Sequence, residues 1–168
     1  MKKLMPLAVV VVAGLVLLFA SCATTKSDKS IADDLDARIK ASGLKNVDVK
    51  TTDRGVTVTA GALNFPADSA QITADTAKRL DAIGDLLKGY TDKKMLIEGH
   101  TADVGDKKSQ LDLSKKRAQA VADYLVKKGV VKASQLVIEG KGGTVPLAGN
   151  NTDEGRAKNR RVQITLLR

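Results

Sequence analysis

The sequence predicts an α/β fold, more closely an α+β fold of two layers, in which helices pack on one face of a single mixed sheet. Three observations support this prediction. Short runs with alternating apolar residues are typical of strands, and longer runs with apolar residues every three or four positions are typical of helices. The two kinds of run alternate along the chain and are joined by short connections. Short connections keep successive elements adjacent, so one sheet can carry all the helices on the same side.

The first 22 residues resemble an export signal that ends in a lipidation site. Two lysines precede an apolar run, and the small pair Ala20-Ser21 stands directly before Cys22, the only cysteine. A membrane-spanning helix is the alternative, but the run contains proline and glycine and is near the short limit of a spanning segment. We expect residues 1–21 to be removed as a signal peptide. Cys22 would then carry acyl chains such as palmitate, with residues 22–30 as a flexible tether.

Residues 31–168 are then expected to form one domain with its own core. The full chain has a net charge of +9, and removal of the two signal-peptide lysines leaves +7. A basic balance favours an anionic partner, such as a membrane face or a carboxylate-bearing polymer, although solvated surface lysines in excess give the same charge. Nucleic acid is not expected as a partner, because an exported protein does not meet it and few aromatic side chains are present for base stacking.

The domain begins with a predicted helix and a predicted hairpin. Ile31–Ala41 carries apolar residues at four-residue spacing, and Gly43 is its expected end. Valines alternate on both sides of Asp53-Arg54-Gly55, which predicts a β-hairpin. We extend the second strand of this hairpin through Leu63 to Phe65.

The rest of the chain predicts two longer helices and three strands. These elements are a helix from the N-cap Thr73 to Gly89, a strand over Lys94–Gly99, a helix over Leu113–Lys128, a strand over Gln135–Gly140 and a strand over Val162–Leu167. Before the last strand lie a long loop over 142–151 and a polar segment over 154–161, to which we assign no element.

The stretch 95–117 is the predicted functional segment. Its strand ends at Gly99, a polar loop follows, and a helix carries Arg117 in its second turn. Strand ends and helix N-termini offer backbone donors to an anionic ligand. The stretch therefore predicts a binding loop and not a catalytic site.

From Leu63 onward the sequence resembles the OmpA-like C-terminal domain family, which includes the peptidoglycan-associated lipoprotein. Three blocks in order carry the resemblance: Phe65–Ile72, Glu98–Leu125 and Gly142–Val162. The resemblance implies a β-α-β-α-β core that holds the stem peptide of peptidoglycan noncovalently. Together with the lipidation signal, it implies a lipoprotein anchored in the outer membrane, with its domain in the periplasm and other envelope proteins as candidate partners.

The resemblance also implies which residues contact the wall. The candidate peptidoglycan-binding residues are Thr101, Asp103, Gln110, Arg117, Asn159 and Arg160. Arg117 matches the family arginine that holds the ligand carboxylate, and Arg160 matches the first arginine of an N-R-R triplet beside it. Gln110 stands where the family usually has asparagine. Without a binding role, Arg117 would pair on the helix surface and Arg160 would begin a strand in solvent.

Two aspartates of the family pattern are replaced. Ala102 follows His100-Thr101, where the family favours the acid that pairs with the ligand ammonium, and Pro66 occupies a second acid position. Asp103 and Asp68 lie one and two residues beyond these positions, and a shift of one residue in a loop re-aims a carboxylate. The sequence therefore predicts a pocket that keeps its cationic half and loses its anionic half.

The sequence has no pattern typical of an enzyme, a metal site or a cofactor site. His100 is the only histidine, which excludes a His-rich metal site and any pair that uses a second histidine, and we expect it to pack at the strand end. Gly140–Gly143 lacks the lysine and hydroxyl spacing of a phosphate loop. We therefore expect a non-enzymatic tether between membrane and wall. The alternative is an interaction lipoprotein whose degenerate pocket binds another protein in place of peptidoglycan.

Overall fold

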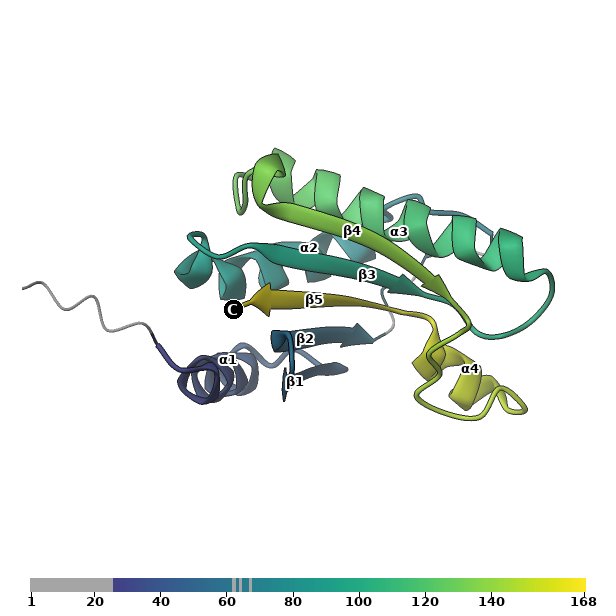
Figure 1. The fold of residues 1–168 in the computed structure, drawn as a ribbon, viewed down its shortest axis with the longest axis horizontal. Helices are drawn as coiled ribbons and strands as arrows, with labels where there is room; N and C mark the ends of the chain where they lie inside the picture. The colour runs from purple at the N-terminus through teal and green to yellow at the C-terminus, as the bar shows by residue number, and fades with distance from the viewer. Residues whose placement is uncertain (1–25, 62, 64, 67) are drawn as a thin grey trace, which may run out of the picture.

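The computed structural model describes residues 26–61, 63, 65–66 and 68–168 of the chain (Figure 1). The predicted signal peptide and Cys22 lie outside the described residues. Within these residues, every helix is either too short or too polar to cross a membrane.

Five strands form one mixed sheet. The elements are α1 (Asp28–Ser42), β1 (Val47–Thr52), β2 (Gly55–Gly61), α2 (Ala74–Leu87), the 3₁₀ turn η1 (Lys88–Tyr90), β3 (Met95–His100), α3 (Lys107–Lys127), the 3₁₀ turn η2 (Ala133–Gln135), β4 (Leu136–Gly142), α4 (Asp153–Asn159) and β5 (Arg161–Leu167). The strand order is β1-β2-β5-β3-β4, with β3 and β4 parallel and the other neighbouring pairs antiparallel. This architecture confirms the predicted fold class.

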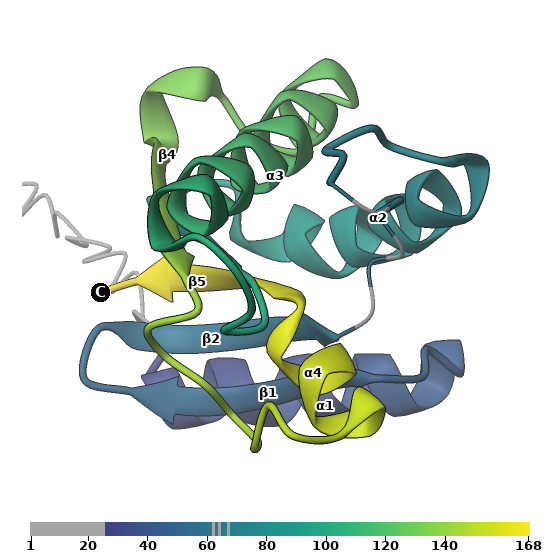
Figure 2. The same cartoon turned by 90° about the vertical axis from the view of Figure 1, so that its right-hand side faces the viewer.

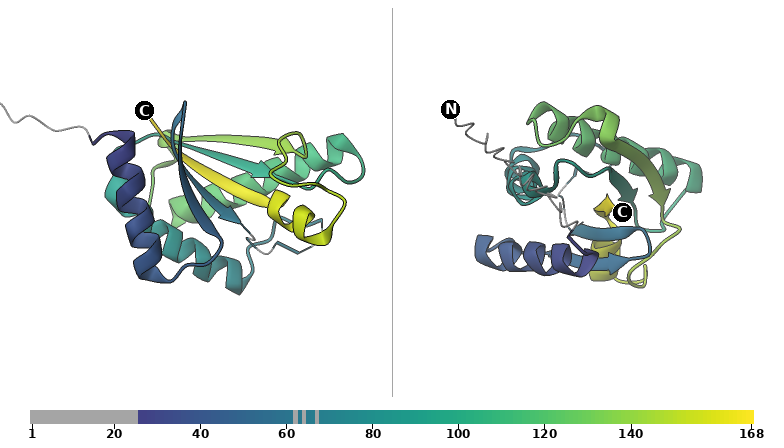
Figure 3. Two further views of the ribbon diagram at one scale, coloured as in Figure 1. Left: turned by 90° about the horizontal axis from the view of Figure 1, so that it is seen from below. Right: turned by 60° about the vertical axis from the view of Figure 1, so that its left-hand side comes forward.

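Helices α1, α2 and α3 pack on one face of the sheet, as predicted, and the core fills the space between the two layers (Figures 1 and 3). Ile97 of β3 and Ile164 of β5 point into this layer, and the residues next to them in each strand point to the other face of the sheet. Leu35, Leu80 and Leu125 face them from the three helices, and all five side chains are at most 1% exposed. Burial of such side chains stabilises the fold by roughly 1.5–3 kcal/mol each.

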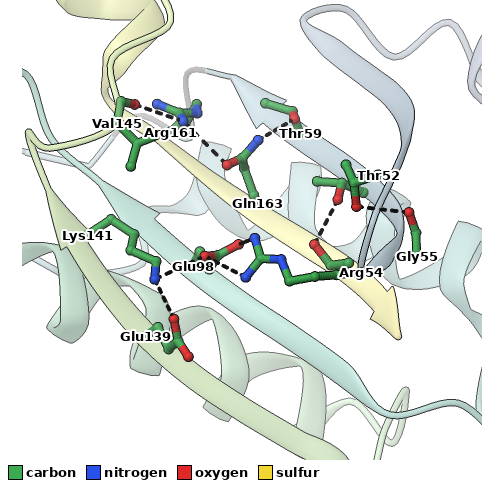
Figure 4. Close-up of polar contacts among 12 residues, drawn as sticks. Thr52, Arg54, Gly55, Thr59, Glu98, Glu139, Lys141, Val145, Arg161 and Gln163 are labelled. Carbon is green, nitrogen blue, oxygen red and sulfur yellow. Dashed lines mark hydrogen bonds and ion pairs between the residues drawn. The ribbon is translucent and has the colours of Figure 1, made fainter. Parts of the chain in front are cut away.

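The opposite face of the sheet is polar (Figure 4). Glu98 of β3 is 2% exposed, and its carboxylate accepts hydrogen bonds from Arg54 at 3.2 and 2.7 Å. The ammonium of Lys141 in β4 lies 3.6 Å from the same carboxylate. Because Arg54 belongs to the hairpin turn, Glu98 links the hairpin to the β3–β4 pair. Removal of either basic partner would leave a buried charge poorly compensated, which is costly.

Helix α3 begins at Lys107, six residues before the predicted start at Leu113. Asp106 is its N-cap, and the carboxylate accepts a hydrogen bond from the backbone N–H of Ser109 at 2.7 Å. The apolar periodicity that marked the predicted start appears only where the helix meets the sheet, whereas the cap fixes the polar first turns. Arg117 consequently lies in the third helical turn, and the prediction of the second turn is wrong.

The polar segment before β5 contains the short helix α4, which the sequence analysis missed. The side chain of Thr152 is its N-cap and accepts a hydrogen bond from the N–H of Gly155 at 3.0 Å. Seven residues without an apolar stripe give no periodicity to detect, so the cap is the only signal.

Two boundaries in the N-terminal half also differ from prediction. Leu63 and Phe65 do not extend β2, which ends at Gly61, because its partner β5 begins opposite that residue. Helix α1 begins at Asp28 behind a serine N-cap, so the last three residues assigned to the tether are helical. Its predicted end at Gly43 is confirmed by the left-handed backbone of that glycine.

Candidate functional site

The candidate residues gather at the end of the sheet where β3 ends and β5 begins. The loop from β3 to α3, the segment before α2, and α4 all lie at this end, on the right of Figure 1 and toward the viewer in Figure 2. They enclose a hollow of about 720 Å³. We call it the outer hollow, and its lining includes Asp68, Thr101, Ala102, Gln110, Arg117 and Arg160.

Arg117 is the central cation of the outer hollow and is only 7% exposed. Its guanidinium donates hydrogen bonds to the carbonyl oxygen of Ser69 at 2.9 Å and to that of Pro66 at 3.1 Å. The ring of Phe65 lies 5.2 Å from the guanidinium carbon, within cation–π distance. Burial lowers the pKa of Arg117, and the nearby charge of Asp68 opposes this shift.

Arg117 forms no ion pair with any described residue, in contrast to Arg54, Arg156 and Arg168. A buried charge normally has a counter-charge at contact distance, because an isolated charge is costly to remove from water. A ligand carboxylate in the outer hollow would supply that counter-charge.

Asp68 brings an acid into the same hollow. Its backbone has φ 49°, which is uncommon for a residue other than glycine, and the turn that carries it is closed by a hydrogen bond from Ser69 N–H to Pro66 O at 3.2 Å. Because Arg117 binds the carbonyl groups at both ends of this turn, the arginine also fixes the position of Asp68. Asp68 thus lines the hollow that the sequence predicted to lack an anionic half, with Pro66 and Ala102 at the two positions where the resemblance implies acids.

The other predicted residues divide into two groups. Thr101, Gln110 and Arg160 line the outer hollow. Asp103 does not line it. Asp103 lies at a neighbouring hollow of about 330 Å³, which Gln110 also borders.

Asn159 is fully buried and braces a loop. Its side-chain oxygen accepts hydrogen bonds from the N–H groups of Leu147 at 2.7 Å and Ala148 at 3.1 Å. Its side-chain nitrogen donates to Ala148 O at 2.8 Å and to Asn150 Oδ1 at 2.9 Å. These four bonds use its donors and acceptors, so it supports the site from behind and offers the ligand nothing.

Sequence reasoning missed Asp106 and Arg156, which also line the outer hollow. Asp106 could have been found as an N-cap three residues before Ser109. Arg156 had no signal, because its position depends on α4. Within the described residues, no group of three or more His, Cys, Asp or Glu side chains is placed to hold a metal ion.

Comparisons with known proteins find a matching family, related sequences and a similar solved structure. The profile of the OmpA family matches residues 64–160. The peptidoglycan-binding protein ArfA of Mycobacterium tuberculosis is 39% identical over 109 residues, which are 65% of this chain and 33% of ArfA. The peptidoglycan-associated lipoprotein of Buchnera aphidicola is 35% identical over 100 residues, which are 60% of this chain and 57% of that lipoprotein. The chain thus spans about a third and just over half of the length of these two relatives.

One solved structure covers more of the fold. The cell wall anchor of the T6SS from Pseudomonas aeruginosa superposes with a TM-score of 0.65 and is 32% identical. The match covers 82% of this chain and 96% of that structure.

Proposed function

This chain belongs to the OmpA family, and on that premise we propose that it binds peptidoglycan noncovalently through the outer hollow and tethers the cell envelope to the wall. The names of two relatives, a peptidoglycan-binding protein and a cell wall anchor, support the proposal. The observation that carries it is Arg117, a buried guanidinium that lines the hollow and has no carboxylate partner among the described residues.

The ligand that fits this site is the stem peptide, at its diamino acid. A carboxylate of that residue would accept hydrogen bonds from Arg117, with Arg160 beside it, and the ammonium would face Asp68. Charge-assisted hydrogen bonds of this kind are about twice as strong as neutral ones and give a fixed orientation. Binding of a zwitterion in this way involves no covalent step, so the protein acts as a receptor for the wall and not as an enzyme.

The position of the site in the molecule suits a tether. Helix α1, where the described chain begins, lies at the left of Figure 1, and the outer hollow lies at the opposite end of the long axis. If Cys22 is acylated, the step from Cys22 to Asp28 spans at most about 22 Å. The acyl chains would hold the domain close to the outer membrane, and the hollow would face away from the bilayer toward the wall.

Sedimentation with purified sacculi tests the proposal. Arg117→Met removes the charge at similar length, and we expect it to weaken sacculus binding at least tenfold, because a hydrogen bond to a charged group contributes about 1.5–3 kcal/mol. Lys116→Met is the matched control, since it removes a charge from an exposed neighbour on the same helix.

Thermal unfolding of Arg117→Met should show little change, because loss of two hydrogen bonds is offset by removal of an unpaired buried charge. Equal sedimentation of parent and Arg117→Met would place the wall site elsewhere. Failure of the parent itself to sediment would favour the alternative, in which the hollow binds another envelope protein.

A further inference from the structure

Strand β1 is an edge of the sheet, with β2 as its one strand neighbour among the described residues. A hydrogen bond from Gly61 N–H to Asn46 O at 2.9 Å continues the register of this hairpin beyond β1. Antiparallel pairs alternate between bonded and non-bonded, so Val47, Val49 and Thr51 turn their backbone N–H and C=O groups away from β2. Among the described residues, none forms a hydrogen bond with these outward groups. A free edge of this kind is a template for another strand.

The side chains of β1 divide between the two faces of the sheet. Val47 and Val49 pack against the core on the helix side. Asp48 and Lys50 alternate with them and therefore point to the polar face. Both are exposed, and neither forms an ion pair with any described residue. The polar face of β1 thus presents one free acid and one free base, separated by a single residue.

This order of charges is complementary to itself. If a second copy of β1 pairs antiparallel about a two-fold axis at Val49, Asp48 of each copy lies opposite Lys50 of the other. On the helix side, Val49 then lies opposite its own copy, and Val47 lies opposite Thr51. The outward backbone groups form the hydrogen-bonded pairs of this register, and the charged residues form the non-bonded pairs, in which side chains are closest. Opposite charges that face each other directly stabilise a strand pair, and like charges oppose it.

The charges also exclude the neighbouring registers. An axis at Asp48 would place that acid opposite its own copy, and an axis at Lys50 would do the same with the base. Charges on edge strands often serve to prevent pairing. Two charges of one sign would do so in all three registers, whereas an acid and a base repel in the flanking registers and attract in the central one. The pattern therefore selects one pairing.

We propose that β1 joins two copies of this chain into a two-fold dimer, in which the two sheets become continuous across the β1 edges. The interface is isologous, since each copy contributes the same strand. It lies outside residues 64–160, the part that the OmpA family profile matches, and no residue of β1 lines the outer hollow. Both hollows of a dimer stay open, so two linked sites would bind a polymeric wall more tightly than one.

Sedimentation equilibrium of the full chain in a density-matched detergent tests the proposal, because a dimer has twice the mass of the 17.7 kDa chain. A single pair of strands is a small interface, so we expect the parent to form dimers at concentrations up to millimolar, which a membrane anchor would reach locally. Asp48→Lys and Lys50→Asp each place two pairs of like charges across the axis. Each variant should weaken dimerisation at least about tenfold.

Two rescues make the test specific to this register. The double variant Asp48→Lys with Lys50→Asp restores opposite charges and should dimerise like the parent. An equimolar mixture of the two single variants should form mixed dimers, since one copy then carries two lysines and the other two aspartates. Lys116→Asp is the control, because it makes the same charge change on α3, which packs under β3 and β4 at the other side of the sheet.

Thermal unfolding should be the same for all variants, because the altered side chains are exposed. A parent that stays monomeric at millimolar concentration would refute the proposal. Dimers that persist in both single variants would place the interface on another surface. Loss of dimers in the single variants without recovery in the double variant or in the mixture would refute the register about Val49.

Discussion

The substitution Ala102→Asp introduces a carboxylate at the position where the resemblance to the family implies one, and it tests how the outer hollow binds an ammonium. Ala102 is 8% exposed and lies in the wall of the hollow, so the new carboxylate would be largely removed from water. A charged hydrogen bond there contributes about 1.5–3 kcal/mol, or a gain of roughly 10- to 150-fold in affinity for a ligand with a free ammonium. Asp68 is exposed, so its attraction for the same ammonium is screened to about 0.2–1 kcal/mol, a factor of roughly 1.5 to 5.

Titration calorimetry with one soluble muropeptide measures these effects. We expect Ala102→Asp to tighten binding of a peptide that ends in a meso-diamino acid, but not of an analogue without the distal amino group. Asp68→Asn should weaken binding by less than about fivefold. Asp103→Asn is the matched control, because Asp103 lines the neighbouring hollow.

The double variant Ala102→Asp with Arg117→Met should show a non-additive effect, since both side chains would contact one ligand residue. The opposite pattern, with binding abolished by Asp103→Asn and unchanged by Ala102→Asp, would refute the placement of the loop and its acids.

Three further predictions concern folding, pH and the anchor. Gly55→Val should destabilise the fold by at least about 2 kcal/mol, because Gly55 has φ 139° and a Cβ there would lie 2.0 Å from the carbonyl oxygen of Leu166. Gly43→Val, at φ 68° with open space around it, is the control for backbone strain alone, and equal thermal midpoints for the two variants would refute the steric argument. Burial lowers the pKa of His100 from its ordinary value of 6.5 to about 3 in the folded state. Between these pH values only the unfolded state binds a proton at this residue. The free energy of unfolding should therefore be highest above pH 6.5 and fall by about 1.4 kcal/mol per pH unit as the pH drops from 6.5 to 3. Urea unfolding at several pH values should show a shallower dependence for His100→Gln, and an unchanged slope would contradict the neutral imidazole. Cys22→Ala should leave an uncleaved precursor without acyl chains, and mature protein that still partitions into detergent would disprove the lipoprotein assignment.

The sheet and the three long helices could be predicted from the sequence because their buried faces repeat with the period of the element. Val56 and Val58 alternate into the core, and Leu80 and Leu87 recur on one helix face. The errors fall where hydrogen bonds of side chains, and not apolar spacing, determine the structure. Asp106 caps α3 at Lys107, nearly two helical turns before the start that apolar spacing predicted. Thr152 caps a helix that has no apolar stripe.

Of the site's charged residues, Arg117 and Arg160 could be predicted from the sequence, whereas Arg156 and the acids were not. Arg117 could be placed near the loop after β3, because that segment is continuous in sequence. Its partners could not be placed, since the turn at Pro66–Ser69 comes from a different part of the chain and meets Arg117 only in the folded sheet. The sequence does not mark a left-handed residue at position 68, because aspartate adopts that conformation more often than most residues but still only in a minority of cases.

The two hydrogen bonds from Arg117 to this turn connect the site's charges to each other. Pro66 and Ala102 supply no carboxylate at the two positions where the resemblance implies one, but Asp68 lies on a turn whose carbonyl groups accept hydrogen bonds from the arginine. A ligand carboxylate that binds Arg117 would therefore also stabilise the turn that presents Asp68 to the ligand ammonium. On this argument, arginine and acid act as one unit, and Asp68→Asn should lose its effect on binding once Arg117 is replaced by Met.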